Sequence, residues 1–240
     1  MKDPGRMLLM PAYVLHQHDW RETSRVVEIL SREHGRLGAV ARGARRAKSP
    51  WRAVLRPFQP LLLSWTGGGE LATLIGAEPA GAAHQFSGRT LMSGYYMNEL
   101  LLRLLPRHDP QPDLFDRYAE TLGRLPCAAA PALRVFEKHL LAALGYGLNL
   151  ERDAASGLPV QANILYRYEP EQGPVGVVAA DDFGIHISGG SLMALAAENL
   201  QHPEQLRETR QLLQAVLDRL LGGRPLKTRE VMRAFSKAGI

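Results

Sequence analysis

Seven basic side chains and no acidic ones lie between Arg36 and Arg56 of the 240-residue sequence. Guanidinium and ammonium groups neutralise phosphate oxygens, and the release of condensed counterions then drives binding to a nucleic acid of any sequence. Gly43 and Ala44 lie among these charges, and such small residues let a backbone approach its ligand closely. The segment shows no base-reading device, so it predicts contacts with little sequence specificity. The predicted contact residues are Arg36, Arg42, Arg45, Arg46, Lys48, Trp51, Arg52 and Arg56.

Other interpretations of this basic segment stay open. A solvated surface loop gains solubility from the same charges and binds nothing. Trp51 offers an indole for stacking on a base, or it anchors a short helix to the protein, because Val54 and Leu55 follow it at helical spacing. Arg36 fits a turn between strands as well as a phosphate contact.

No catalytic or metal-binding pattern accompanies the basic segment. His16 and His18 would share one face of a strand, but no third ligand lies near them in the sequence. Cys127 is the single cysteine, which excludes a disulfide or a thiolate zinc cluster within one chain. The glycines at 67–69 lack the Lys-Ser/Thr pair of a phosphate-binding loop. The sequence therefore predicts a protein that is not an enzyme and has no cofactor or metal.

Five short apolar segments bounded by turn signals predict the strands that would position the basic segment. Ser49 and Pro50 predict the N-cap and first residue of a short helix between the third and fourth strands. A small helix at that place among five strands is the element order of an OB-fold barrel, which often binds single-stranded nucleic acid. The predicted strands cover residues 7–16, 24–33, 35–43, 58–65 and 70–78.

Helical periodicity begins after about residue 80. Helices are predicted from Ser87 to about Leu105 and from Asp113 to about Leu125. Another is predicted from Pro131 to just before Gly145, because proline is common at the first position of a helix and glycine just after its end. Further helices are predicted over residues 191–200 and 203–221 and from Thr228 onward.

Residues 151–188 interrupt the helical pattern with short apolar runs and Gly and Pro turns, which predict a small β insertion. We therefore expect an α+β protein with two domains. Residues 1–80 would form an OB-fold nucleic-acid-binding domain, and residues 81–240 would form a helical domain that carries the insertion.

The composition describes a folded chain with a basic balance. Hydrophobic residues make up 45% and charged residues 22%, enough for a packed core. The formal net charge of +5 favours a polyanionic partner. The N-terminal residues contain no uninterrupted apolar run as long as a signal peptide or a membrane span. These features predict a cytoplasmic protein that does not contact membranes.

Several segments resemble, in order, the RecO family of bacterial recombination mediators, and together they cover nearly the whole chain. The resemblance implies an N-terminal OB-fold, a C-terminal helical domain, binding of single- and double-stranded DNA, and annealing of complementary strands. It implies a nucleoid-associated protein that works with RecR and RecF. Together the three proteins would load RecA onto DNA coated by the single-stranded-DNA-binding protein, SSB. The segments are DWRETSRVVEILSREHGRLGAVARGARRAKS, LRPFQPLLLSW, LMSGYYMNELLLRLL, PALRVFEKHLLAALGYGLNL and GGRPLKTREVMR.

The β insertion departs from the family pattern. Many RecO proteins bind zinc there through two CxxC pairs, whereas Asp153 and Ser156 lie near where cysteines of the first pair would be. Soft sulfur ligands make such structural sites, so the sequence resembles the zinc-free branch. The insertion would then be held by packing of Tyr166, Tyr168, Val177, Phe183 and Ile185.

Two further sets of residues are candidates under this resemblance. Near the C-terminus, a basic segment adds DNA contacts or is a helix end kept soluble by its charge. The tail of SSB is acidic and ends in an apolar residue with a free carboxylate, so its receptor would pair an apolar pocket with a base. Arg134 and Lys138 are the candidates for that base, and the alternative is that they are ordinary exposed helix charges. The C-terminal basic residues are Arg224, Lys227, Arg229 and Arg233.

Rival functions make different predictions. Charge reversal at residues 42–48 separates two of them. It would abolish strand annealing by an annealing protein, whereas a scaffold would still assemble with RecR and SSB. An OB-fold RNA-binding protein would prefer RNA to DNA of equal sequence through 2′-hydroxyl contacts. A nuclease would need clustered carboxylates for a metal, and the sequence does not show them.

Overall fold

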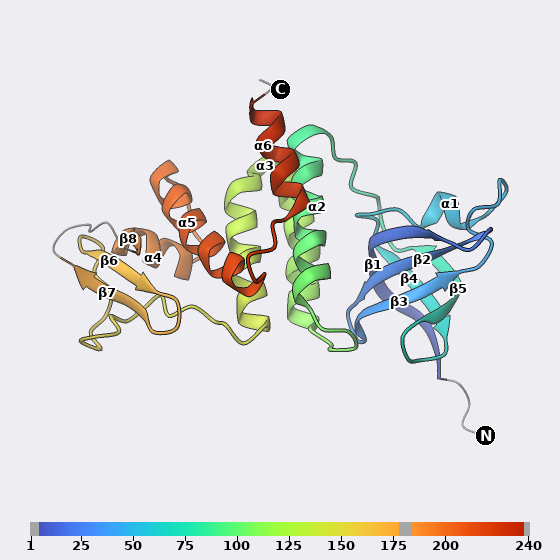
Figure 1. The fold of residues 1–240 in the computed structure, drawn as a ribbon, viewed down its shortest axis with the longest axis horizontal. Helices are drawn as coiled ribbons and strands as arrows, with labels where there is room; N and C mark the ends of the chain where they lie inside the picture. Colours follow the sequence, from blue (N-terminus) through green and yellow to red (C-terminus); the bar gives the residue numbers. More distant parts are fainter. Residues whose placement is uncertain (1–4, 178–183, 238–240) are drawn as a thin grey trace. The chain divides into compact units, whose positions relative to one another are not determined.

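The computed structural model describes residues 5–177 and 184–237, and Figure 1 shows its ribbon. The chain forms two compact units, the first of Met1–Gly123 with Val231–Ile240 and the second of Arg124–Glu230. The predicted α+β class is confirmed: a closed five-stranded barrel precedes a helical region that carries a small extra sheet. The domain division into residues 1–80 and 81–240 stays a prediction.

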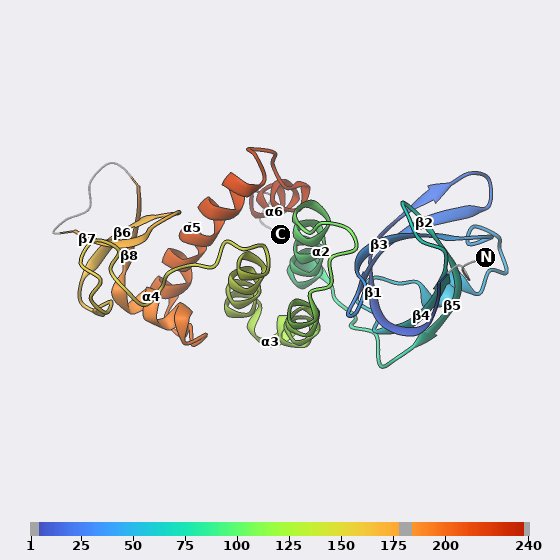
Figure 2. The ribbon, with the colours of Figure 1, turned by 90° about the horizontal axis from the view of Figure 1, so that it is seen from below.

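The first unit contains the barrel, which Figure 2 shows as a ring of strands. The strand order β1-β2-β3-β5-β4, with β3 and β5 parallel, is that of an OB-like barrel. The short helix α1 lies between β3 and β4, as the sequence predicts. The elements are β1 (Arg6–Trp20), β2 (Ser24–Ser31), β3 (Gly35–Ala41), α1 (Trp51–Val54), β4 (Leu61–Thr66) and β5 (Ala72–Pro79).

Alternating apolar side chains of all five strands fill the barrel. Val27, Ile29, Ala39 and Leu63 are fully buried in this core. Irregularities in β1 between Met7 and Met10 and between Val14 and His16 bend the strand, so that it pairs with both β2 and β4. This bending lets β1 close the barrel. The strand continues to Trp20, past its predicted end at residue 16, because its last residues pair with β2.

Two helical segments of the first unit pack on β1. They are α2 (Gly88–Leu104) and the first turns of α3 (Pro112–Ala143). Tyr118 donates a hydrogen bond of 2.7 Å to Asn98 Oδ1, and Asn98 Nδ2 donates one of 2.9 Å to the Leu15 carbonyl. Burial raises the pKa of Tyr118 well above its usual value. The ring of Tyr13 contacts the ring of Tyr118 edge-on. The hydrogen bond between Tyr118 and Asn98 is therefore buried beside packed aromatic rings, where both polar groups have a partner.

Helix α3 covers the two helices that the sequence predicts and has a kink at Ala128, where φ is −147° and ψ is 52°. Pro126 and Pro131 flank the kink, and a proline lacks the N–H group that a continuous helix requires. The prolines therefore mark the change of direction, although the helical turns continue on both sides of it.

The second unit contains the β insertion and the remaining helices. The sheet has the order β7-β6-β8 and buries Tyr166 and Tyr168, two of the predicted packing residues. Burial raises the pKa of Tyr168 to about 12. Phe183 lies outside the described residues. The elements are β6 (Leu165–Glu169), β7 (Gly173–Val177), β8 (Ile185–Ser188), α4 (Gly189–Ala196), α5 (Pro203–Leu220) and α6 (Lys227–Lys237).

A carboxylate cross-links the turn that precedes this sheet. Asp153 Oδ1 accepts hydrogen bonds from the amides of Ser156 and Ala155, and Oδ2 accepts one of 2.8 Å from the amide of Gly176 in β7. These backbone donors, that of Ser156 first, hold the pKa of Asp153 below its usual value of 3.8. Asp153 therefore joins residues 153–156 to β7.

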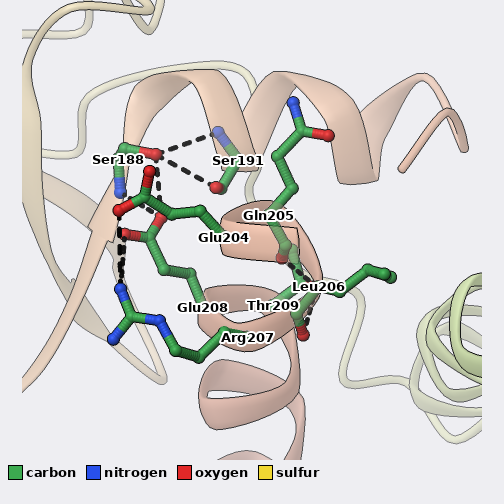
Figure 3. A network of polar contacts seen from close by, with 8 residues as sticks. All are labelled: Ser188, Ser191, Glu204, Gln205, Leu206, Arg207, Glu208 and Thr209. Carbon is green, nitrogen blue, oxygen red and sulfur yellow. Dashed lines mark hydrogen bonds and ion pairs between the residues drawn. The ribbon is translucent and has the colours of Figure 1, made fainter. Parts of the chain in front are cut away.

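A second carboxylate fixes the start of α4 on α5 (Figure 3). Glu208 Oε2 accepts hydrogen bonds from the Ser188 amide at 3.0 Å and from the Ser188 hydroxyl at 2.8 Å. Ser188 Oγ in turn accepts from the Ser191 amide, which caps α4. Burial alone would raise the pKa of Glu208, but the serine hydrogen bonds outweigh it and the pKa is lowered.

Across the two described ranges, no helix is long and apolar enough to cross a membrane.

Candidate nucleic-acid interface

A groove of about 730 Å³ opens on the first unit where β1 and β3 end and β2 and β5 begin. We call it the rim groove. Its walls come from the β1–β2 turn, from the start of the basic segment, and from the start of β5. The lining residues are Trp20, Arg21, Thr23, Ser24, Val40, Arg42, Gly43, Arg46, Leu71, Ala72 and Thr73.

The basic loop at residues 42–50 is a chain of tight turns, not an extended arm. The amide of Arg46 donates to the Gly43 carbonyl at 3.1 Å, and the amide of Ser49 donates to the Arg46 carbonyl at 3.0 Å. Gly43 has a φ of +70°, a conformation that glycine adopts without strain. Ala44 is buried in the barrel core, so the loop is fixed to the barrel from within.

The prediction that Ser49 caps the short helix is wrong. Pro50 occupies the N-cap position of α1, and no side chain forms a capping hydrogen bond there. Within the described ranges the Ser49 hydroxyl is buried without a hydrogen-bond partner.

Arg45 connects the basic loop to the β1–β2 turn. Its amide donates to the Thr23 carbonyl at 2.9 Å, and its guanidinium donates to the Arg21 carbonyl at 2.9 Å. The same guanidinium lies 3.2 Å from Asp19 Oδ2. These contacts hold two walls of the rim groove together, so Arg45 shapes the groove whether or not it also meets a phosphate.

Arg42 and Arg46 are the predicted contact residues that line the rim groove. Lys48, Arg52 and Arg56 are exposed nearby on the loop and on α1 and its end. In the part of the chain that the structure describes, none of these five side chains forms an ion pair. Their charge is therefore available to a phosphate without first breaking an internal bond.

Trp51 has the contacts of an anchor. It is half-buried against the barrel core, and its indole Nε1 donates a hydrogen bond of 3.0 Å to the Arg42 carbonyl. The indole thus fixes the backbone of a groove residue. Stacking of a base on Trp51 stays a prediction.

Arg36 lies on β3 within an internal ion pair. Its guanidinium is 3.1 Å from Glu28 Oε2, and its Nε donates to the Leu105 carbonyl at 3.0 Å. Only 14% of the side chain is exposed, so a phosphate would have to compete with these partners. A DNA contact at Arg36 stays a prediction.

Sequence reasoning missed most of the lining residues, among them Trp20, Arg21 and Leu71. Trp20 is 40% exposed, and Arg21 has a φ of +51° at the β1–β2 turn. A Trp-Arg pair next to a turn was the available signal, because an exposed aromatic beside a base is typical of nucleic-acid surfaces. The predicted first strand ends at residue 16, four residues before Trp20, so the prediction does not place this pair at a turn of the barrel.

The chemistry of the rim groove favours an anionic chain that carries flat apolar groups. Arg21, Arg42 and Arg46 contribute guanidinium groups to its lining, and no described Asp or Glu lines it. Trp20 and Leu71 add apolar surface among these charges. Guanidinium groups bind phosphate oxygens, and an indole stacks on any base, so the groove suits a nucleic acid of any sequence.

The C-terminal basic residues have unequal surroundings. Arg229 forms an ion pair with Asp218, and its side chain is 12% exposed. Arg224 and Lys227 are exposed in and after the turn that precedes α6, and Arg233 is exposed on that helix. DNA contact by these four residues stays a prediction.

Arg134 and Lys138 lie on the second part of α3, four residues apart. Arg134 is buried and donates a hydrogen bond of 2.7 Å to Glu137. Lys138 lies 2.7 Å from Glu198. Burial alone would raise the pKa of Glu198, but hydrogen bonds from Lys138 and His139 outweigh it and the pKa is lowered.

A smaller pocket of about 280 Å³ adjoins Lys138 in the second unit. Arg134 does not line it. The pocket places one base, Lys138, beside leucine and alanine side chains, and Asn149 and the acidic Glu151 also line it. A base beside apolar side chains is the combination expected for the end of an acidic peptide with an apolar last residue. Its lining residues are Lys138, Ala142, Gly147, Leu148, Asn149, Leu150, Glu151 and Ala196.

Among residues 5–177 and 184–237, no three His, Cys, Asp or Glu side chains gather as they would around a metal ion. Cys127 is exposed and unpaired in the described chain. The described lining of the rim groove combines guanidinium groups with apolar and hydroxyl side chains.

The closed barrel with its arginine-lined rim groove defines a protein of the OB-fold class. Comparison with known proteins places it further. The family model described as Recombination protein O N terminal matches residues 7–83, and the one described as Recombination protein O C terminal matches residues 85–230. The chain belongs to the RecO family.

Curated relatives named DNA repair protein RecO match over nearly their full length. The protein of Alkalilimnicola ehrlichii is 47% identical over 234 residues, which are 97% of this chain and 93% of the relative. That of Nitrosococcus oceani is 45% identical over 98% of this chain and 96% of its own. That of Aromatoleum aromaticum is 46% identical over 99% of this chain and 100% of its own. Membership of this family supports a role in DNA repair.

Proposed function

We propose that this protein is a recombination mediator that binds single- and double-stranded DNA without sequence specificity and anneals complementary strands. With RecR and RecF it helps to load RecA onto SSB-coated DNA, in the bacterial cytoplasm and in association with the nucleoid. It needs no catalytic residue and no cofactor. The single observation that carries the proposal is the rim groove, with its arginines and exposed Trp20.

Annealing follows from charge and needs no bond chemistry. Two complementary strands repel each other through their phosphates, and a basic surface lowers that repulsion while raising the local concentration of both. Arg42 and Arg46 hold one strand in the groove, and the exposed Lys48, Arg52 and Arg56 neutralise the approaching second strand. Base pairing itself selects the correct partner.

The test is a strand-annealing assay with a fluorescently labelled pair of complementary oligonucleotides. Wild type should accelerate annealing, and Arg42→Glu/Arg46→Glu should abolish the acceleration, because two attractive charges become repulsive. The matched control is Arg89→Glu/Arg210→Glu, which changes the net charge equally at two exposed residues outside the groove. Equal loss in both double variants would refute the groove as the annealing site and leave only a net-charge effect.

The same proteins separate the rival functions. If Arg42→Glu/Arg46→Glu stops annealing but still assembles with RecR and SSB, annealing and recruitment are separate activities of one protein. If wild type never anneals DNA but still recruits both partners, the scaffold hypothesis replaces the proposal. A clear preference for RNA over DNA of equal sequence would favour an RNA-binding protein.

For the SSB tail we propose the pocket beside Lys138. The tail's terminal carboxylate would pair with Lys138 Nζ, and its last apolar side chain would contact Leu148 and Leu150. Lys138→Glu should weaken binding of a labelled SSB-tail peptide measured by fluorescence anisotropy. Arg210→Glu is the control, because it makes the same charge change on α5 outside the pocket. Equal affinity of Lys138→Glu and wild type would place the tail elsewhere.

A further inference from the structure

The corner at residues 106–111, between α2 and α3, lies against the outer face of β3. The amide of His108 donates a hydrogen bond of 2.9 Å to the Arg36 carbonyl, and Arg36 and Arg107 form a parallel bridge. The contact is close: a Cβ atom on Gly35 would lie 2.2 Å from the Asp109 carbonyl oxygen. A glycine is therefore required at residue 35 for the corner to reach the strand.

A buried carboxylate holds the corner in place. Glu28 on β2 forms ion pairs with Arg36 through Oε2 and with Arg107 of the corner through Oε1. Arg36 also donates from Nε to the Leu105 carbonyl, the last residue before the corner. One carboxylate therefore joins two strands of the barrel to the end of α2, with each of its oxygens held by a different arginine. Charge-assisted hydrogen bonds of this kind are stronger than neutral ones.

The corner also reaches the glycine-rich loop at residues 67–70. Arg107 donates a hydrogen bond of 2.9 Å to the Glu70 carbonyl. The imidazole Nε2 of His108 lies 3.1 Å from the Gly69 carbonyl, and since a carbonyl only accepts, Nε2 carries the proton. Two consecutive residues of the corner thus satisfy two consecutive carbonyls of the loop.

This loop needs an external support. Gly67 and Gly69 have φ angles of +82° and +92°, and glycine loses more conformational freedom than any other residue when it is fixed. The loop leads into β5, whose parallel pairing with β3 has only the registered pairs Ala39–Ala72 and Val40–Thr73. The supported loop therefore lies beside the β3–β5 pair, which has the fewest registered residue pairs in the barrel.

Leu71 connects this support to the rim groove. A Cβ atom on Gly38 would lie 2.8 Å from Leu71 Cδ2 and 2.9 Å from a guanidinium nitrogen of Arg107. Leu71 and Arg107 therefore lie together over the bare backbone of Gly38. Leu71, Ala72 and Thr73 form one wall of the groove.

We propose that the corner at residues 106–111 is a clamp that positions this wall of the rim groove for DNA. Arg107 and His108 are its positioning residues, and they act through Leu71 and the start of β5. The inference rests on the proposed function, because DNA is the ligand of the groove. Without the clamp the wall is ordered in only a fraction of molecules, and the apparent affinity falls to that fraction of its intrinsic value.

Glu28→Gln separates the clamp from simple electrostatics, since the two predict opposite signs. Removing a negative charge near a DNA site raises affinity if charge alone matters. The clamp predicts that single-stranded DNA affinity falls about tenfold, as expected if about a tenth of the molecules keep the wall in place. Glu22→Gln is the control, because Glu22 is exposed in the β1–β2 turn beside the groove and should bind DNA slightly more tightly.

His108→Ala gives a second test, with no change in formal net charge. It should also lower DNA affinity several-fold, without changing the salt dependence, because no phosphate contact is lost. Arg107→Met should lower affinity as well, and Arg107→Lys should restore part of it by keeping a donor for Glu70 and Glu28. Circular dichroism at the binding temperature shows whether each variant is folded, so an unfolded Glu28→Gln leaves the two corner variants to decide.

Hydrogen exchange of the Thr73 amide tests the clamp without DNA. The clamp predicts faster exchange at Thr73 in His108→Ala than in wild type, with Val27 in the barrel core unchanged. Unchanged exchange at Thr73, or tighter DNA binding by folded Glu28→Gln, overturns the clamp. If wild type itself does not bind DNA, the proposed function fails, while the exchange result still decides whether the corner orders the wall.

Discussion

Replacing Trp20 with alanine should weaken binding of single-stranded DNA and leave duplex binding nearly unchanged. Trp20 is the tryptophan that lines the rim groove, and it is 40% exposed. An unpaired base can stack on its indole, whereas the bases of a duplex are already stacked on each other. The variant therefore separates base stacking from phosphate binding within one groove.

The structure sets the size of this effect. One lining indole provides a stacking surface for one base, and each stacked base contributes about 1 to 3 kcal/mol. Because Trp20 is already partly covered by its neighbours, we expect the lower part of that range, about 1 to 2 kcal/mol, or a loss of about 5- to 30-fold in affinity. Stability should change by less than about 0.5 kcal/mol, since little apolar surface leaves the core.

Fluorescence anisotropy with a labelled oligothymidine and with a duplex of equal length measures both affinities. Trp51→Ala is the matched control. Its indole packs on the barrel core and donates to the Arg42 carbonyl, so its loss should cost about 1 to 3 kcal/mol of unfolding free energy. An equal loss of single-strand and duplex binding in Trp20→Ala would refute stacking, as would no loss at all.

Three further predictions concern the groups that hold the two units in shape. Tyr118→Phe should lower the unfolding free energy by about 1 to 3 kcal/mol in urea denaturation, because it leaves the buried Asn98 carbonyl oxygen without its donor; an unchanged midpoint would contradict this. Glu208→Ala should cost about 1 kcal/mol and increase amide exchange at Ser188 and Ser191, and unchanged exchange would show that the contact does not hold α4. The lowered pKa of Asp153 adds stability that is fully present above the ordinary value of 3.8 and is lost as the pH falls from there through the pKa of the folded state. Amide exchange at Gly176, corrected for its intrinsic pH dependence, should therefore accelerate in acid in wild type. The same acceleration should be absent in Asp153→Asn.

Local sequence signals predicted the barrel because its elements are defined locally. Apolar alternation and glycine turns placed all five strands within a few residues, and the predicted first residue of α1, Pro50, lies one residue before its observed start at Trp51. The continuation of β1 to Trp20 was missed, because its last residues, from His16 to Trp20, are mainly polar or exposed. Their pairing with β2 keeps them in the strand, and the sequence of β1 alone does not show that pairing.

The role of an arginine depends on partners that are distant in the sequence. Arg36 and Arg46 look alike in the sequence, but Arg36 meets Glu28 and the Leu105 carbonyl while Arg46 lines the groove. Arg107, which shares Glu28, follows it by 79 residues. A charge pattern can therefore predict a basic surface, while the fold decides which of its charges face a ligand.

The salt dependence of single-stranded DNA binding tests the central claim most directly. Arg42→Ala/Arg46→Ala should bind more weakly than wild type, and the slope of log affinity against log salt should fall in magnitude by about 1.4, since each lost phosphate contact on a single strand accounts for about 0.7. That result would show that the two arginines of the rim groove neutralise phosphates. A variant with the wild-type affinity and slope would contradict the account and move the DNA site away from the groove.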